Sequence, residues 1–146
     1  MPRRELNWSD FKGVPRLPKP QFTMVPDILF DMYLPALSDA ELRVLLYIIR
    51  HTLGWKKDSD SISLTQLTEG LQKRDGTWQD YGCGLTRRGV INAIRGTKAT
   101  EATAQRKAAK AKPGLEAKGL ISVVSVEGLN GAASVNIYRL RYDDEG

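Results

Sequence analysis

We expect the core of this protein to form around residues 38–52, which read Ser-Asp-Ala-Glu-Leu-Arg-Val-Leu-Leu-Tyr-Ile-Ile-Arg-His-Thr. Ser38 and Glu41 have the spacing of a capping box, in which each side chain bonds to the backbone N–H of the other residue and starts a helix. The pattern predicts a helix over 39–52. Its apolar face holds Leu42, Leu45, Leu46 and Ile49, widened by Val44 and Ile48. A surface this broad must be buried on several sides, so this helix is expected at the centre of the fold.

Shorter helices are predicted on both sides of the central one. A helix over 27–33 follows Pro26, has an apolar stripe at helical spacing and should end at Pro35. On the other side, Ser63 and Gln66 repeat the capping-box spacing and predict a helix over 64–71. A short strand is expected just before it, at 61–63.

A third helix and a hairpin complete the predicted order. Residues 72–84 are polar and hold several turn-forming glycines. Thr86 is then a suitable N-cap for a helix that begins over 87–95. Two β-branched runs, 120–126 and 134–142, flank an Asn-Gly turn signal and predict a β-hairpin.

This order of elements is that of a winged helix-turn-helix. We therefore predict an α+β, mostly helical fold in which the two short helices form the helix-turn-helix and the C-terminal hairpin is the wing. The length of 146 residues fits one domain. We expect an extended basic N-terminal arm at 1–21, a winged-helix DNA-binding domain at 22–142 and an acidic tail at 143–146. A basic, Ala/Lys-rich insertion at 96–114 interrupts the domain.

The composition excludes several classes of protein. No apolar run approaches the length of a membrane span, and the N-terminus lacks the apolar stretch of a signal peptide, so a cytoplasmic protein is expected. The single cysteine, Cys83, and the single histidine, His51, cannot build a disulfide framework or a thiolate metal cluster. The sequence has no phosphate loop and no nucleophile elbow. We predict no enzyme activity, no cofactor and no metal.

The basic charge is concentrated in one segment. Residues 86–118 hold nine basic and two acidic residues, whereas the rest of the chain holds 13 basic and 15 acidic residues. The whole net charge of +5 therefore arises between the third helix and the hairpin. The segment is interpreted either as a solvated lysine-rich face or as a surface that contacts phosphates.

Candidate DNA-binding residues follow from the predicted helix-turn-helix, whose second helix lies in the major groove. Arginine can bond guanine as a fork, and asparagine can do the same with adenine. The candidates on the third helix are Thr86, Arg87, Arg88, Ile91, Asn92 and Arg95. Those in the insertion are Lys98, Arg106, Lys107, Lys110 and Lys112, and the one at the wing tip is Asn130. A solvated polar face remains the alternative for the helix residues, a solvated loop or helix for those of the insertion, and the turn itself for Asn130. Ile91 can also belong to the core.

Several segments together resemble the N-terminal domain of phage replication proteins of the lambda protein O type, also called replisome organisers. They are Phe-Thr-Met-Val-Pro at 22–26, the apolar run at 42–50, Gly-Trp at 54–55 with 62–67, Gly-Cys-Gly-Leu-Thr-Arg-Arg at 82–88, and Leu-Glu-Ala-Lys-Gly-Leu-Ile at 115–121. The resemblance implies binding to repeated sites in double-stranded DNA at a replication origin, usually as a homodimer. A replicative helicase or helicase loader would be recruited through another region or chain.

The chain departs from that family pattern after the third helix. In the pattern Arg95 would be followed almost directly by Leu115, whereas here 19 residues intervene. They either lengthen the recognition helix or loop out beside the DNA. Two other functions remain open on the same fold: a winged-helix transcriptional regulator, and a protein-interaction module in a replication complex. The basic segment favours DNA.

Overall fold

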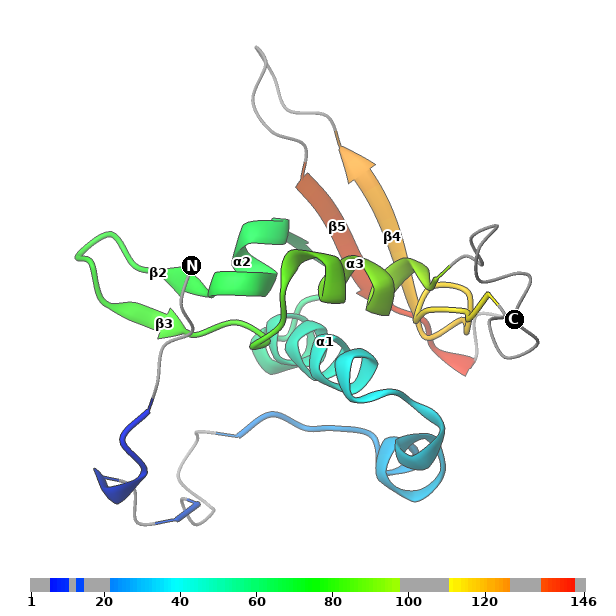
Figure 1. Ribbon diagram of the computed structural model, residues 1–146, viewed down its shortest axis with the longest axis horizontal. Helices are drawn as coiled ribbons and strands as arrows, with labels where there is room; N and C mark the ends of the chain where they lie inside the picture. Colours follow the sequence, from blue (N-terminus) through cyan, green and yellow to red (C-terminus); the bar gives the residue numbers. More distant parts are fainter. Residues whose placement is uncertain (1–5, 11–12, 15–21, 98–110, 127–134, 144–146) are drawn as a thin grey trace.

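The structure, a computed structural model, describes residues 6–10, 13–14, 22–97, 111–126 and 135–143. The elements in chain order are η1 (Trp8–Asp10), η2 (Leu29–Tyr33), η3 (Leu34–Ala36), α1 (Asp39–His51), η4 (Leu53–Trp55), β1 (Asp60–Ile62), α2 (Leu64–Glu69), β2 (Leu71–Gln72), β3 (Trp78–Asp80), α3 (Arg87–Arg95), β4 (Ile121–Val126) and β5 (Val135–Leu140). Three strands form an antiparallel sheet in the order β1-β5-β4, and β2 pairs with β3. The described residues therefore form an α+β fold with small antiparallel sheets (Figure 1).

The capping box at the start of α1 is confirmed. The Ser38 hydroxyl accepts a hydrogen bond from the Glu41 N–H at 3.1 Å, and the Glu41 carboxylate accepts one from the Ser38 N–H at 2.9 Å. The helix runs to His51, one residue short of the predicted end, and Thr52 caps it. Two groups that would be orphaned at the helix N-terminus are thus satisfied by side chains next to them in the sequence.

The buried face of α1 is rotated from the predicted one. Val44 and Ile48 are completely buried, whereas the predicted core residue Leu46 is 37% exposed. Leu46 stands about 200° around the helix from each of them, because successive residues are about 100° apart. Five of the six residues at 44–49 are aliphatic, and this concealed which of them faces outward.

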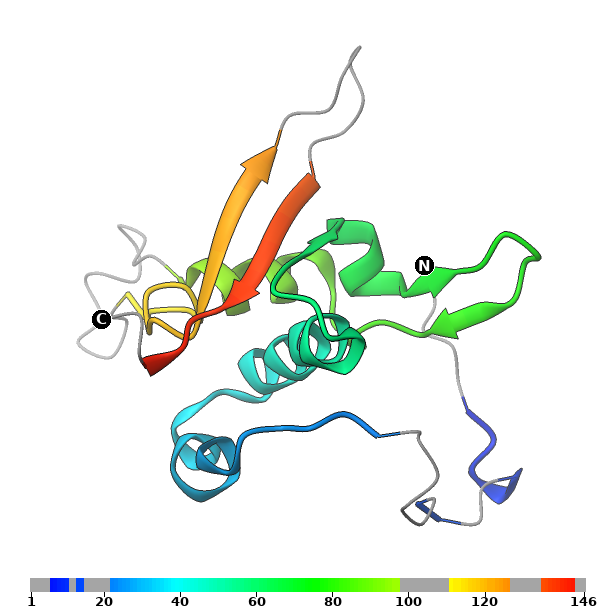
Figure 2. The ribbon, with the colours of Figure 1, turned by 180° about the vertical axis from the view of Figure 1, so that it is seen from behind.

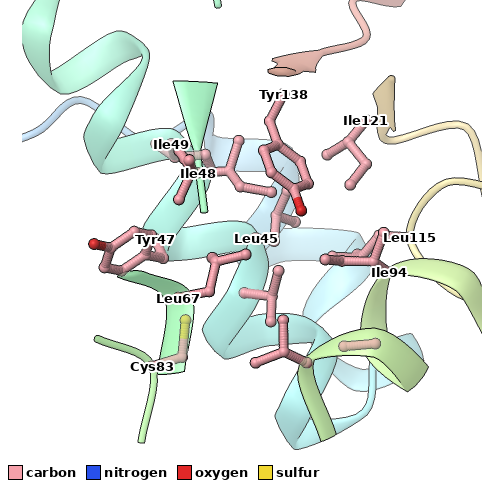
Figure 3. Packing of buried hydrophobic residues seen from close by; sticks show 14 of the residues in the cluster. Leu45, Tyr47, Ile48, Ile49, Leu67, Cys83, Ile94, Leu115, Ile121 and Tyr138 are labelled. Atoms are coloured by element: carbon pink, nitrogen blue, oxygen red, sulfur yellow. The ribbon is translucent and has the colours of Figure 1, made fainter. Parts of the chain in front are cut away.

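The hydrophobic core is built between α1, α3 and the three-stranded sheet. Side chains from α1 point toward Tyr138 of β5 and Ile121 of β4, as Figure 3 shows, and both of these residues are buried. Leu67 of α2 and Ile94 of α3 reach the same cluster from the other side of the helix. The core thus joins elements from the whole described chain.

The C-terminal hairpin is confirmed, with Ile121 opposite Leu140 and Val126 opposite Val135. The predicted short strand is also present, as β1, which pairs antiparallel with β5. Asn130, the predicted wing-tip residue, lies outside the described residues. Tyr138 and Leu140 of β5 are buried in the core, and this packing holds the β4–β5 hairpin against it.

Two segments differ from prediction at their ends. The first predicted helix is a π-helical turn, η2, and the chain continues through Pro35 as the 3-10 turn η3. Proline is tolerated in a first turn because its missing N–H would have no partner there. The α2 helix ends at Glu69 rather than at residue 71, because Gly70 caps it with a φ of 100° and β2 begins directly afterwards.

The stretch predicted as a glycine turn holds a second hairpin. Leu71 of β2 pairs with Asp80 of β3, with an irregular register at the next residue. At its base the backbones meet closely, since a Cβ on Gly70 would lie 2.3 Å from the Asp80 carbonyl oxygen. The strands are too short for an alternating pattern to show, so the sequence displayed only the turn residues.

A partly buried ion pair connects the start of α1 with the turn that precedes β4. Lys118 donates to both carboxylate oxygens of Glu41, at 2.8 and 2.7 Å. Burial alone would raise the pKa of Glu41, but the hydrogen bonds from Lys118 and Ser38 outweigh that effect and hold the pKa below its ordinary value. Glu41 therefore acts both as helix cap and as ion-pair partner.

Truncation of the core face of α1 should destabilise the protein strongly. Ile48→Ala is expected to reduce the free energy of unfolding by about 2–5 kcal/mol, the usual cost of a cavity at a buried isoleucine. The control is Leu46→Ala on the exposed side of the same helix, which should have a much smaller effect. Urea unfolding followed by circular dichroism measures both, and equal losses would contradict the assigned faces.

Acid should weaken the fold partly through Glu41. Because its pKa is lower in the folded protein than the ordinary 4.5, the carboxylate contributes stability above that pH and loses it as the pH falls through the folded pKa. Glu41→Gln should therefore lower stability at neutral pH and flatten its dependence on pH below about 4.5. Urea midpoints measured at intervals between neutral and acidic pH test this, and parallel curves for the two proteins would refute it.

Candidate nucleic-acid interface

The candidate interface is centred on α3, which starts at a side-chain cap. The Thr86 hydroxyl accepts a hydrogen bond from the Gly89 N–H at 3.1 Å, as the sequence predicted. Thr86 itself is exposed, as are Arg87 and Arg88 directly after it. The first turn of α3 therefore presents two guanidinium groups and free backbone N–H groups to the surface.

The two faces of α3 differ sharply. Val90, Ala93 and Ile94 are buried and pack into the core, as predicted. On the remaining surface, Arg95 is exposed like the arginines of the first turn, and Ile91 and Asn92 are half-buried. The arginines at 87, 88 and 95 form no ion pair with a carboxylate in the part of the chain that the structure describes. We call these three residues, with Asn92, the α3 face.

The end of α3 decides between the two geometries that the sequence left open for the insertion. Gly96 leaves the helix with a φ of 83°, and the chain returns at residues 114–116. The N–H groups of Leu115 and Glu116 donate to the carbonyls of Ala93 and Ile94, at 2.8 and 3.1 Å. A longer α3 would need those two carbonyls for its own next turn. The helix therefore ends at Arg95.

The insertion is closed at its base by a pair of backbone hydrogen bonds. Thr97 and Lys112 exchange both N–H···O bonds at 2.9 Å, as an isolated antiparallel bridge. The contact is close, because a Cβ on Gly96 would lie 2.2 Å from the carbonyl oxygen of Lys112. Lys112 is exposed at this base. Four other predicted residues lie outside the described ones: Lys98, Arg106, Lys107 and Lys110.

One basic residue of this segment is tied into the fold. Lys118 contributed to the basic charge counted between the third helix and the hairpin, yet its ammonium group is held by Glu41. The partner lies 77 positions away in the sequence, so no local pattern could reveal it.

The structure also shows a polar cluster that the sequence did not indicate, at the base of the β2–β3 hairpin. The Asp80 carboxylate accepts from the Tyr47 hydroxyl at 2.9 Å and lies 3.1 Å from His51 Nε2. The ring of His51 stacks on Tyr47, with centroids 4.3 Å apart. Gln66 completes the cluster by donating to the Tyr47 hydroxyl at 3.2 Å.

This cluster fixes the hairpin to the core. Burial alone would raise the pKa of Asp80, but hydrogen bonds from His51, the Gly82 N–H and Tyr47 hold the pKa below its ordinary value. A charged Asp80 therefore pins β3 to α1. Tyr47 and His51 lie 33 and 29 positions from Asp80 in the sequence, so only the folded chain brings them together. The hydrogen bond from the Gly82 N–H to Asp80 alone has the spacing of a local turn.

The environment of Cys83 does not activate its thiol. Burial, followed by the nearby Asp80 charge, raises the pKa of the Cys83 thiol to about 12, so the thiol stays protonated at neutral pH. Among the described residues, no three histidine, cysteine or acidic side chains gather as a metal site would need. In the same part of the chain, no helix is long and apolar enough to cross a membrane.

Comparison with known proteins identifies the family. The sequence model of the bacteriophage replication protein O family matches residues 19–123. The matched range extends from before η2 into β4 and includes the insertion. Searches of curated proteins and of solved structures found no match. The family model covers more than half of the chain, and its members act in the initiation of phage DNA replication rather than as a known class of enzyme. This chain therefore belongs to the bacteriophage replication protein O family.

Proposed function

We propose that this protein binds specific sites in double-stranded DNA at a phage replication origin, as a winged helix-turn-helix domain spanning residues 22–142. In this proposal α2 and α3 form the helix-turn-helix, α3 enters the major groove, and the β4–β5 hairpin is the wing. The family role in replication initiation supports the biological setting. A homodimer would fit repeated or palindromic sites, and a helicase partner would bind another region or chain.

The observation that carries the proposal is the α3 face. Arg87, Arg88 and Arg95 are exposed on a helix whose opposite side is buried, so their positions are fixed by the core while their guanidinium groups remain available. Arginine bonds guanine O6 and N7 as a fork, and Asn92 can do the same with adenine N6 and N7. The Thr86 hydroxyl and the N-terminal N–H groups of α3 are suited to a phosphate. Ile91, half-buried at the edge, can reach a thymine methyl group.

The arrangement around α3 supports the same reading. The β4–β5 hairpin projects away from the core beside α3 in both views (Figures 1 and 2). Residues 22–36, the N-terminal segment, and α3 lie on opposite sides of α1 in both views. The α3 face and the N-terminal segment therefore face different directions. The insertion leaves the molecule at the C-terminal end of α3, with Lys112 at its base. We propose that its basic residues Lys98, Arg106, Lys107 and Lys110 add phosphate contacts.

Arg88→Ala should weaken binding and relax specificity. If Arg88 forks a base, affinity for the best site should fall by about 1–3 kcal/mol, and preference should relax at one base pair. Selection of duplexes from a random pool first defines the site, and anisotropy titrations on that site and its single-base variants then measure the loss. The control is Arg141→Ala, an exposed arginine that lines a groove beside η2. An equal loss on every duplex would assign Arg88 to phosphate instead.

Removal of the insertion should reduce non-specific affinity and leave base preference intact. The Thr97–Lys112 bridge has both hydrogen bonds of a tight hairpin pair, so residues 98–111 can be replaced by the two-residue turn Asn-Gly. If two to four phosphate contacts are lost, the slope of log affinity against log salt should flatten by about 2–4. Salt titrations on a specific and a scrambled duplex measure this. An unchanged slope would show that the insertion faces away from DNA. If the wild-type protein shows no salt-dependent DNA binding, the result would favour a protein-interaction module.

A further inference from the structure

We infer that the β2–β3 hairpin is a second DNA-contacting arm, which reaches phosphates beyond the N-terminal end of α3 through Lys73 and Arg74. The inference rests on the proposed DNA binding and assigns a surface outside the α3 face, the insertion and the β4–β5 hairpin. The hairpin occupies the connection between α2 and α3, the two helices proposed as the helix-turn-helix.

The hairpin is a fixed projection. Its base is pinned by Asp80 through the hydrogen bonds with Tyr47 and His51, and by the Cys83 N–H, which donates to the Leu67 carbonyl at 2.9 Å. Glycine is required at residue 70, where the two backbones meet. An arm held in this way presents its tip in one position relative to α3, so little ordering entropy opposes binding.

The tip is built to leave its two cations available. The turn is closed by the Lys73 N–H, which donates to the Thr77 carbonyl at 2.7 Å, and by the Gly76 N–H, which donates to the Lys73 carbonyl at 3.0 Å. The Asp75 carboxylate accepts from the Thr77 N–H and hydroxyl at 2.9 and 2.6 Å. These bonds from Thr77, and the nearby Lys73 charge, lower the pKa of Asp75, so the exposed carboxylate is charged and its hydrogen bonds go to Thr77. The exposed side chains of Lys73 and Arg74 form neither a hydrogen bond nor an ion pair within the described part of the chain.

The chemistry of the exposed surface favours nucleic acid over protein. Around the two cations the exposed side chains are the polar Gln72, Thr77 and Gln79, and the carboxylate of Asp75, which is bonded to Thr77. The amide and hydroxyl groups, with lysine and arginine, are the usual partners of phosphate oxygens. A surface for a protein partner would show a group of exposed large apolar side chains, as the N-terminal segment does at Phe30, Met32 and Leu34, whereas residues 72–77 at the hairpin tip show none.

The β2–β3 hairpin lies where it would face the DNA beside the groove that α3 enters. Figures 1 and 2 show the β2–β3 and β4–β5 hairpins projecting in different directions, with α3 between them in the first view. When α3 lies in the major groove, an arm beyond its N-terminal end faces the phosphate backbone at the edge of that groove. Such contacts position the protein and carry no base information.

A charge-matched comparison tests the inference. The double variant Lys73→Gln with Arg74→Gln should flatten the slope of log affinity against log salt by about 1–2, since each lost phosphate contact contributes about 0.9. The ratio of affinities for the specific and scrambled duplexes should stay unchanged. The control, Lys56→Gln with Arg141→Gln, removes two exposed charges elsewhere and should keep the wild-type slope. A hairpin variant that behaves like the control overturns the inference.

A second measurement locates the arm directly. Cys83 is buried, so a new thiol from Gln79→Cys can be labelled selectively with an iron chelate that cleaves nearby DNA. Cleavage should be confined to one flank of each half-site, whereas the same label at Met32→Cys should cut without a preferred position. Equal, diffuse cleavage from both positions refutes the arm. If Arg88→Ala still impairs specific binding in that case, the proposed function stands alone. If the wild-type protein binds no DNA, both fail.

Discussion

The burial of α1 on several sides is the constraint that places every other element. Val44 and Ile48 have no exposed surface, and that state requires α3 and the sheet to cover the helix together. A helix as short as α3 would be marginal in water by itself, so its shape and direction come from this packing. The buried core residues therefore fix the direction in which the arginines of the α3 face point. The packing that stabilises the core therefore also sets the geometry of the candidate interface.

The same packing explains how the chain accommodates a long insertion at the end of α3. Leu115 is completely buried, and its N–H bonds back to α3, so the core continues as though the chain passed directly from the helix to this residue. The Thr97–Lys112 bridge then joins the two ends of the insertion. Closing a loop of this size costs only slightly more than closing a shorter one. Basic residues in the insertion can therefore change without disturbing the position of α3.

Local signals in the sequence predicted the elements well, and long-range contacts account for what they missed. The capping residues Ser38 and Thr86 act on their own helices, so their spacing alone located α1 and α3. The β2–β3 hairpin escaped because it depends on Asp80 meeting Tyr47 and His51 of α1. Leu46 was misplaced because a helix rich in aliphatic residues all round does not reveal its outer side. For the site, helical spacing placed the α3 arginines on one face.

Charge counting alone was a poor guide to which cations are available for a ligand. Lys118 belongs to the basic segment but is paired with Glu41, and Arg43, outside that segment, donates to the Cys83 carbonyl at 3.2 Å. Both side chains serve the fold. Arg88 and Arg74 have no such partner among the residues that the structure describes, and they stand on elements whose other side is anchored in the core or hydrogen-bonded to it. A phosphate can replace water around a cation of this second kind without breaking an existing bond, so electrostatic attraction to DNA is gained at no cost to folding. Whether a cation is available depends on where carboxylates and carbonyls lie in three dimensions. Among the described residues, this criterion selects particular basic surfaces at the two ends of α3.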